Sequence, residues 1–552
     1  MSNRRTVILL NVALVVVTIA VFANTLNNPF VFDDKTAIVN NESIRSWGTV
    51  WPPPDLPVVA ARPILNLSFA FNYAVDGYRE RGYHAVNLAI HICAGLLLFA
   101  LLRRTLPDTP ISLCFVITLF WLIHPLQTEC INYVSQRSEL LMSLFYLATL
   151  YAAARAFDAS QSRGWCIVAV IACTLGMLSK EAMVTAPLMV WLWARVFRRD
   201  QMSRHTVFLA SLAATWLVLA TVMMAWPRTQ SVGFGHEISA WTYLLNQSVM
   251  ICHYLRLVVY PHPLLLDYGL PQVLTLSEVW PYCLALIALI ILTIYFLKRK
   301  PSLGFAGAWF FILLSPTSSF VPIVTEVGAQ RRMYLPLIGI LGLIAAIPRR
   351  MLPGILVIGL MVAAVLGGLS MKRNAQYADA IVLWQSAVQH RPENARAHNN
   401  LANLYRDRRD YQQALTHYQL AADLNPKESV VYSNLGKALV KMDQEESTGH
   451  RLPKAIAAFE KSLQYDEENS DALNNLGVLM IRHNKYPEAI NYMKRAVAVS
   501  PDDDVAHYIL ARLLLAANRR DEAVIYLKKA VEANPANKAA VEALKKLGQM
   551  QR

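Results

Sequence analysis

Long apolar stretches fill the first two-thirds of this 552-residue chain, and they limit the folds open to it more than any other feature. They run at about 6–23, 85–102, 109–123, 140–156, 165–179, 182–197, 206–226, 279–297, 303–315, 333–348 and 351–371. A helix needs roughly 20 mostly apolar residues to cross a bilayer. We therefore predict an all-α membrane domain of about eleven spans over residues 1–372, three of them short.

The remaining residues, 373–552, are polar and repeat with a fixed period. Pro392 and Pro426 lie 34 residues apart, and so do Pro501 and Pro535. The interval between the two pairs holds two such periods plus seven residues near Asp443–Leu452. A period of 34 residues is typical of the tetratricopeptide repeat. We predict a solenoid made of a half repeat, four full repeats and a polar capping helix at 537–550.

Basic doublets at the ends of apolar stretches account for much of the net charge of +14. They are Arg4–Arg5, Arg103–Arg104, Arg198–Arg199, Lys298–Arg299–Lys300 and Arg349–Arg350. All fall on one side if the spans alternate, which is the bias of cytoplasmic loops. This pattern predicts a cytoplasmic N-terminus, outside loops at 24–84, 124–139, 227–278 and 316–332, and repeats outside. It favours a membrane role over nucleic-acid binding.

Two adjacent carboxylates, Asp33 and Asp34, follow an aromatic triplet just beyond the first span. A partly desolvated carboxylate at the membrane surface can act as a general base on an alcohol. We predict that one of the two is catalytic. The alternative is that Asp33 caps a short interfacial helix at 34–41.

Several cations lie on the expected outer face, against the bias of the doublets: Arg137, Lys180, Arg331, Arg332 and the pair Lys372–Arg373. An anionic ligand would explain them, and guanidinium groups hold phosphate through paired hydrogen bonds. We predict that Arg137, Arg331, Arg332 and Lys180 bind a lipid phosphate. The alternative for Arg137 is an ion pair with Glu129 or Glu139. For Glu181 it is a place in the first turn of the next helix, and for Arg331 and Arg332 it is interfacial anchoring.

Supporting roles are expected for the polar groups around these positions, which are His84, Arg62, His124, Glu129, Glu139, Glu181 and Tyr334. No spacing typical of three metal ligands occurs, so we expect no metal site. The seven cysteines all fall in the membrane half and are interpreted as packing residues.

Asn400, Asn434 and Asn475 precede the Leu-small pair of successive repeats, and Ile509 breaks the series. A carboxamide can pair with both the donor and the acceptor of a peptide backbone. The row therefore predicts a surface for an extended acceptor peptide, and it resembles the Asn ladder of the nucleocytoplasmic O-GlcNAc transferase. Alternatively, each Asn bonds only to a neighbouring repeat.

Five segments resemble the transmembrane and tetratricopeptide-repeat-containing (TMTC) O-mannosyltransferases and their bacterial relatives. They are FVFDD at 30–34, the segment 62–91, HPLQTECINYVSQRSELL at 124–141, LSKEAMVTAP at 178–187 and RRMYLP at 331–336. The resemblance implies a C-type glycosyltransferase that inverts the sugar and uses a polyprenyl-phosphate donor. It implies that Asp33 or Asp34 takes the acceptor proton while Arg137 and Arg331 or Arg332 hold the leaving phosphate. It implies no need for a divalent metal or other cofactor.

The low repeat number departs from the eukaryotic pattern and leaves the acceptor class open. A protein Ser or Thr hydroxyl is the leading prediction. Transfer to a lipid or cell-surface glycan is an alternative, and a membrane scaffold without catalysis is another. The short loops favour a bacterial inner membrane with periplasmic repeats over the endoplasmic reticulum. The sequence does not specify the sugar.

Overall fold

A computed structural model describes residues 2–548 apart from 55, 57, 159–161, 228–237, 320, 349–350 and 447–448. The described residues form helices and connecting loops and contain no β-strand. Two compact units are present, Met1–Ser386 and Ala387–Arg552, which we call the membrane unit and the repeat unit. Their division falls inside helix α15 (Ala380–His390), later in the chain than the predicted boundary at 372/373.

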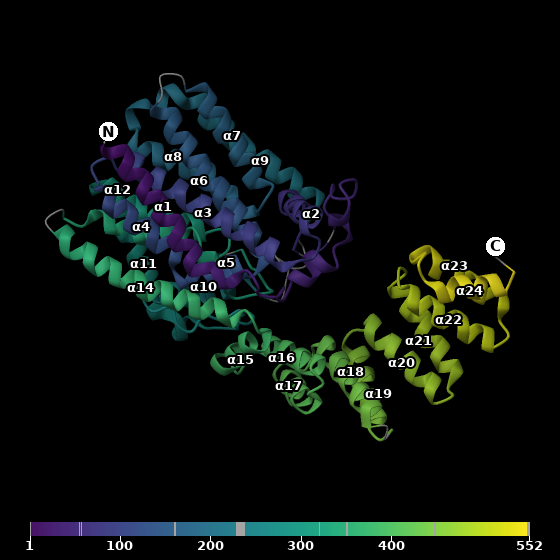
Figure 1. Ribbon diagram of the computed structural model, residues 1–552. Coiled ribbons are helices and arrows are strands. Elements are labelled where there is room, and N and C mark those ends of the chain that lie inside the picture. The colour runs from purple at the N-terminus through teal and green to yellow at the C-terminus, as the bar shows by residue number, and fades with distance from the viewer. Residues whose placement is uncertain are drawn as a thin grey trace. The chain divides into compact units, whose positions relative to one another are not determined.

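Six helical segments in the described part of the membrane unit are long and apolar enough to cross a bilayer: Arg4–Thr25, Glu80–Thr105, Val134–Asp158, Arg199–Ala225, Leu276–Arg299 and Leu356–Gln376. They contain α1 (Ser2–Phe22), α3 (Glu80–Thr105), α6 (Arg137–Asp158), α9 (Thr206–Ala225), α11 (Leu276–Arg299) and the end of α14 (Leu352–Gln376). Figure 1 shows α1, α3, α6 and α14 running along roughly one direction.

The other apolar stretches form shorter or bent helices. Helix α4 (Ile111–Ile123) turns by 48° into the helical segment Pro125–Asn132, and this pair could make a seventh span. Helices α7 (Arg163–Met177), α8 (Ala186–Phe197), α12 (Pro301–Leu314) and α13 (Pro336–Gly342) are all below 18 residues. Every predicted stretch therefore contains a helix. The predicted total of about eleven spans stays a prediction.

Helix α6 forms the middle of the membrane unit, whereas α11 lies at its edge. Most of the apolar window of α6 is buried (72%), against 6% for α11. Small side chains at Ala152, Ala153, Ala154 and Ala156 let neighbouring helices approach α6 closely. On α11, large apolar side chains remain exposed on all sides, as expected of a surface that faces lipid.

Two helices occur where the sequence predicted outside loops. They are α2 (Pro63–Asp76) and α10 (Ala240–Val259). In α10 the polar residues Asn246, Gln247 and Ser248 interrupt the apolar pattern, yet all three are buried in the protein. A hydropathy scan misses this helix because its polar side chains face other protein groups instead of lipid.

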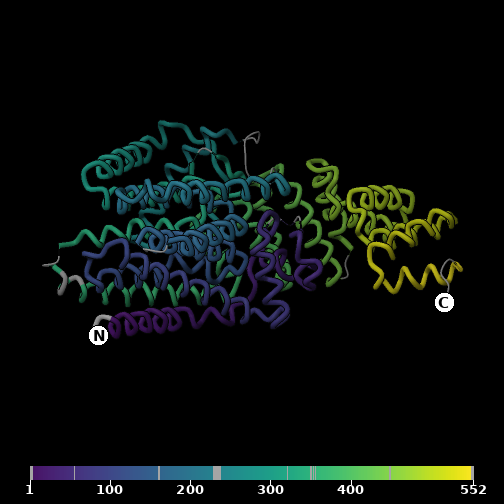
Figure 2. Tube along the Cα trace, turned by 90° about the horizontal axis from the view of Figure 1, so that it is seen from above, coloured from purple at the N-terminus to yellow at the C-terminus, as the bar shows by residue number. Residues whose placement is uncertain are grey.

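Three asparagines join the start, middle and end of the membrane unit. Asn28 Nδ2 donates to Asn132 Oδ1 at 2.7 Å, and Asn132 Nδ2 donates to Asn374 Oδ1 at 2.8 Å. Asn28 Nδ2 also donates to the carbonyl of Asn374 at 3.0 Å. Because all three side chains are buried, this network fixes the loop after α1 against the end of α14. Figures 1 and 2 place this loop and α2 at the end of the membrane unit opposite the N-terminus.

The repeat unit confirms the tetratricopeptide prediction. Four helix pairs follow α15: α16–α17 (Ala395–Asp407, Tyr411–Leu424), α18–α19 (Ser429–Glu446, Leu452–Tyr465), α20–α21 (Ser470–Arg482, Tyr486–Val499) and α22–α23 (Asp504–Ala516, Arg520–Ala533). Helix α24 (Lys538–Lys546) ends the described solenoid, and the last two residues of the predicted cap, 549–550, lie outside the described residues. The seven extra residues lengthen α18 to 18 residues, against 13 for α16, α20 and α22.

Helix caps explain why the period is so regular. Asn394, Asn469, Asp503 and Asn537 each precede a helix and accept a hydrogen bond from the backbone N–H three residues later. Such a cap satisfies one of the free donors at the helix start. Three of the four stand two residues after the prolines that mark the repeat, so α16, α22 and α24 each have a start signal at the same place in the period.

Candidate functional site

Asp34 is buried and joins two loops that lie far apart in the sequence. Its Oδ1 accepts from the backbone N–H of Ser135 at 2.7 Å and from the Ser135 hydroxyl. Its Oδ2 accepts from the backbone N–H of Val134 at 3.2 Å and of Val31 at 3.1 Å. Burial raises the pKa of Asp34 to about 7, although these hydrogen bonds lower it. Asp34 therefore holds residues 31–34 against the loop before α6.

Asp33 differs from its neighbour because its side chain is only half-buried. Tyr133 donates its hydroxyl to Asp33 Oδ2 at 2.5 Å. Phe32 has a φ of 51°, and this left-handed residue turns the chain before Asp33. The Phe32 ring packs 6.0 Å from Tyr133 and 5.5 Å from Trp384, centroid to centroid. Asp34 precedes the short helix Lys35–Val39 and makes no side-chain cap bond to it, and the alternative that Asp33 caps a helix over 34–41 stays a prediction.

Arg137 is fully buried and holds helices together. Its Nε donates to Asn87 Oδ1 at 2.6 Å, and its Nη1 donates to Asn72 Oδ1 at 2.6 Å. Its Nη2 donates to the backbone carbonyl of Tyr83 at 3.0 Å, and the guanidinium lies 4.9 Å from the centre of the Phe69 ring. Every nitrogen already bonds a neutral oxygen, which favours a structural role for Arg137, and its predicted role in phosphate binding stays a prediction. The predicted ion pairs with Glu129 and Glu139 do not form.

Arg331 and Arg332 share two carboxylates. Arg331 Nη1 binds Glu129 at 2.6 Å and Arg331 Nη2 binds Glu326 at 2.5 Å. Arg332 Nη2 binds the other oxygen of Glu326 at 3.1 Å and Arg332 Nη1 donates to the carbonyl of Thr317 at 2.9 Å. Two cations and two carboxylates cancel, so this group offers a phosphate much less net charge than the sequence predicted.

Arg331 nonetheless acts electrostatically on Tyr133, which bonds Asp33. Burial raises the pKa of Tyr133 strongly, the negative charge of Asp33 adds to the shift, and the positive charge of Arg331 opposes it. Asp33, Tyr133, Arg331 and Glu129 therefore form one cluster of charged and polar groups. The alternative that paired Glu129 with Arg137 is wrong, because Glu129 pairs with Arg331.

Lys180 and Arg62 also have carboxylate partners. Lys180 Nζ binds Glu139, and both side chains are about nine-tenths buried. Arg62 Nη2 binds both oxygens of Glu181, at 3.1 and 3.2 Å. Glu181 does stand in the first turn of the following helix, as the alternative predicted. Lys180 is not positioned as a phosphate clamp, because its charge is already neutralised in a buried pair.

His84, His124 and Tyr334 bond to backbone or to other side chains. His84 Nε2 bonds the carbonyl of Asn28 at 2.9 Å and His124 Nε2 bonds that of Val258 at 3.0 Å. The Tyr334 hydroxyl bonds His91 Nδ1 at 2.6 Å. All three side chains are buried, so their supporting role is to fix the loops around the site. No group of three His, Cys, Asp or Glu side chains that could hold a metal occurs in the described residues.

Arg373, near the end of α14, was not included in the predicted site. Its side chain is buried, its Nη1 donates to Gln376 Oε1 at 2.6 Å, and its Nε and Nη2 have no hydrogen-bond partner. The sequence carried a signal for it, because Lys372–Arg373 breaks the positive-inside bias. Helix packing buries Arg373 and leaves Lys372 exposed, and a sequence pattern does not distinguish the two.

The row of asparagines in the repeat unit has mixed roles. Asn434 is buried and donates to Asn399 of the preceding repeat at 3.1 Å, so the alternative of a repeat-to-repeat bond holds there. Asn475 donates to the carbonyl of Asp471 in its own helix at 2.7 Å. Asn400 Nδ2 has no partner. This nitrogen is itself buried, so the role of the row in peptide binding stays a prediction.

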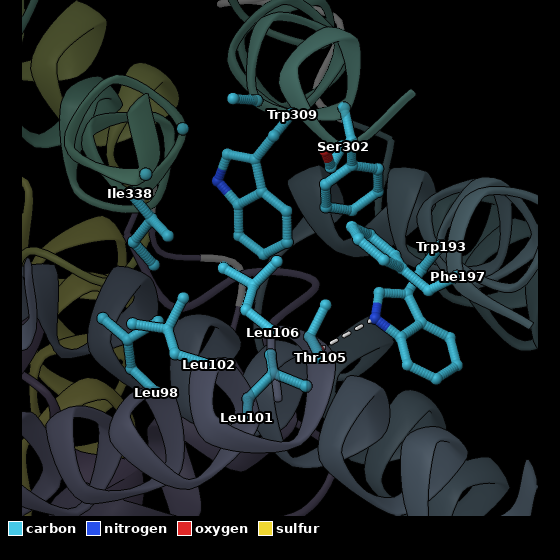
Figure 3. Close-up of a pocket in the computed structure, with 14 residues that line it drawn as sticks. Leu98, Leu101, Leu102, Thr105, Leu106, Trp193, Phe197, Ser302, Trp309 and Ile338 are labelled. Carbon is cyan, nitrogen blue, oxygen red and sulfur yellow. Dashed lines mark hydrogen bonds between the residues drawn. The ribbon is translucent and has the colours of Figure 1, made fainter. Parts of the chain in front are cut away.

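A separate apolar cavity of about 80 Å³ lies between the C-terminal end of α3 and helices α8, α12 and α13 (Figure 3). Leu98, Trp193, Phe197 and Trp309 line it, and a hydrogen bond of 3.1 Å joins Trp193 to Thr105. Leu102 in its wall is eighteen residues after His84 on α3, or roughly 27 Å along the helix. No charged side chain lines the cavity, so it is not a candidate reaction centre.

Comparisons with known proteins confirm the resemblance to the TMTC proteins. The chain is 22% identical to Protein O-mannosyl-transferase F38B6.6 of Caenorhabditis elegans over 436 residues, which cover 75% of this chain and 62% of that protein. It is 29% identical to Protein O-mannosyl-transferase TMTC4 of Homo sapiens over 198 residues, 31% of this chain and 27% of that protein. The chain thus spans less than two-thirds of the length of these relatives.

Residues 395–428 and 480–547 match family models described as tetratricopeptide repeat. Among solved structures, the crystal structure of MamA is 22% identical, covers 30% of this chain and 94% of its own, and aligns with a TM-score of 0.26. The apolar helices and the repeats together define a membrane protein with a protein-binding type of solenoid.

Proposed function

We propose that this chain, as a relative of the protein O-mannosyl-transferases, is a membrane glycosyltransferase that moves a sugar from a polyprenyl phosphate to a Ser or Thr hydroxyl of a protein. The proposal places the reaction on the outer face of a bacterial inner membrane, with the N-terminus in the cytoplasm and the repeats in the periplasm. The observation that carries it is Asp33: a half-buried carboxylate, oriented by Tyr133, in a loop fixed by the buried Asp34.

Asp33 is the better base of the two aspartates. A base must reach the proton it takes, and Asp34 is buried with both oxygens already accepting hydrogen bonds. Asp33 takes the hydroxyl proton while the acceptor oxygen forms a bond to the anomeric carbon from the face opposite the phosphate. The bond from that carbon to the phosphate oxygen breaks, and its electron pair leaves with the polyprenyl phosphate. The result is inversion at the anomeric carbon.

Supporting groups have a defined place in this scheme. Tyr133 holds Asp33 by a hydrogen bond and lies within the field of Arg331. Arg331 is anchored by Glu129 and Glu326, so its position is fixed before any substrate binds. The expected sugar, mannose, rests on the relatives' names. The expected protein acceptor rests on those names and on the solenoid.

The test is turnover by the purified full-length protein reconstituted in vesicles with polyprenyl-phosphate mannose and a Ser- and Thr-rich peptide. Asp33→Asn should lower the rate of peptide modification by about 100-fold or more, because a general base contributes that much. Glu42→Gln removes an exposed carboxylate from the same loop and should leave the rate unchanged. Equal rates for wild type and Asp33→Asn would contradict the proposal.

A further inference from the structure

The guanidinium of Arg373 is the least satisfied buried cation of the membrane unit. Its side chain belongs to a residue only 5% exposed, and Nε and Nη2 have no hydrogen-bond partner. Its one hydrogen bond, from Nη1, goes to the neutral side chain of Gln376. A buried charge without a counter-charge is costly unless something else compensates it.

The other buried cations in the described part of this unit are compensated. Lys180, Arg62 and Arg332 each have a carboxylate partner. Arg137 has none, but each of its nitrogens donates to an oxygen. Arg373 has neither form of compensation, so it is the cation best suited to receive an anion from outside the chain.

One phenol beside Arg373 is incomplete in the same way. The guanidinium carbon lies 5.1 Å from the centre of the Tyr377 ring. The hydroxyl of Tyr377 is buried without a hydrogen-bond partner. Burial raises the pKa of Tyr377, the charge of Arg373 opposes the shift, and Glu129 adds to it. Arg373 and Tyr377 therefore share one electrostatic neighbourhood with Glu129, the partner of Arg331.

This neighbourhood is tied to the Asp33 loop. Asn374, next to Arg373, accepts from Asn132 at 2.8 Å, and Asn132 precedes the Tyr133 that holds Asp33. The end of α14 that carries Arg373 is thus joined through Asn132 and Tyr133 to the loop that carries Asp33. A donor lipid that presents its sugar to Asp33 needs its phosphate held in such a place.

We propose that Arg373 Nε and Nη2, with the hydroxyl of Tyr377, bind the phosphate monoester of the polyprenyl donor. This proposal rests on the proposed function. Phosphate suits the three donors because its oxygens accept several hydrogen bonds at once, and a guanidinium presents two parallel N–H groups to it. This proposal assigns phosphate binding to Arg373, whose N–H donors are not all in use, instead of to Arg137, Arg331, Arg332 and Lys180.

The test is equilibrium binding of polyprenyl monophosphate to the full-length protein in nanodiscs, which requires no sugar transfer. Arg373→Gln should weaken binding by about tenfold to a hundredfold, as expected for lost hydrogen bonds to a charged group. Lys372→Gln removes the same charge from the exposed neighbouring residue and should bind as wild type does. Inorganic phosphate should compete with the lipid in wild type. Unchanged lipid binding in Arg373→Gln would overturn the proposal.

Two further arms keep the result decisive. If Arg373→Gln does not fold, Tyr377→Phe removes one donor without touching the charge, and it should also weaken binding. Wild-type affinity in that variant would contradict the site. Asp33→Asn should bind the lipid normally. A chain that binds the lipid through Arg373 but transfers no sugar would refute the proposed function and support the site.

Discussion

At the scale of single residues, Asp33 and Asp34 show how two identical neighbours take different roles. The sequence predicted that the pair matters, because both follow an aromatic triplet beside the first span. It did not separate them, since their environments come from Tyr133, Val134 and Ser135, about one hundred residues away. A left-handed Phe32 turns the chain so that one carboxylate is enclosed and the other stays half-buried.

The raised pKa of Asp34 predicts a pH-dependent stability. Burial raises the pKa from 3.8 to about 7, so folding favours the protonated form. The stability this group contributes is complete below the lower value and is lost as pH rises through the higher one. Unfolding temperatures of wild type and Asp34→Asn, measured in detergent from about pH 5 to about pH 8, should converge as pH rises. Parallel curves would show that Asp34 does not titrate in this range.

At the scale of helices, the hydropathy pattern predicted where helices lie in the sequence but not which side chains they bring into contact. All eleven apolar stretches contain a helix, but α10 was missed because its polar residues are buried against protein. The sequence singled out the charged residues of these loops but did not predict most of their hydrogen-bond and ion-pair partners. A side chain's partner depends on helices far apart in sequence, such as Glu129 and Arg331, which a linear pattern does not contain.

Arg137 should be a stability residue, not a donor-binding one. Arg137→Met removes hydrogen bonds that join α6 to Asn72 and Asn87, and leaves those carboxamides unpaired. We expect a loss of about 3 kcal/mol in the free energy of unfolding. Lipid binding below the unfolding temperature should stay unchanged. Arg81→Met, at an exposed position of α3, is the matched control and should alter neither quantity.

At the scale of the whole molecule, the repeat unit was far easier to predict than the membrane unit. Three of the four repeats carry a side-chain cap at their first helix, so local residues encode much of the 34-residue period. The membrane unit has no such period. Its span count depends on how short helices such as α7 and α12 meet the bilayer, which length and composition do not determine.

The asparagine row predicts a separation between stability and acceptor binding. Asn400→Ala should lower the apparent affinity for the protein acceptor without changing the unfolding temperature, because Asn400 Nδ2 has no partner within the repeat unit. Asn434→Ala should lower the unfolding temperature, because it removes the bond to Asn399. Steady-state kinetics with the acceptor varied, together with thermal unfolding, distinguish the two. An Asn400→Ala variant with unchanged kinetics would remove the peptide-binding role.

The central claim is that Asp33 performs sugar transfer to proteins on the outer face. The most direct measurement is the intact mass of outer-face proteins from cells that lack this chain and are supplied with wild type, Asp33→Asn or Glu42→Gln at equal protein levels. We predict hexose-sized mass additions with wild type and Glu42→Gln, and their absence with Asp33→Asn. The same additions with Asp33→Asn would contradict the account.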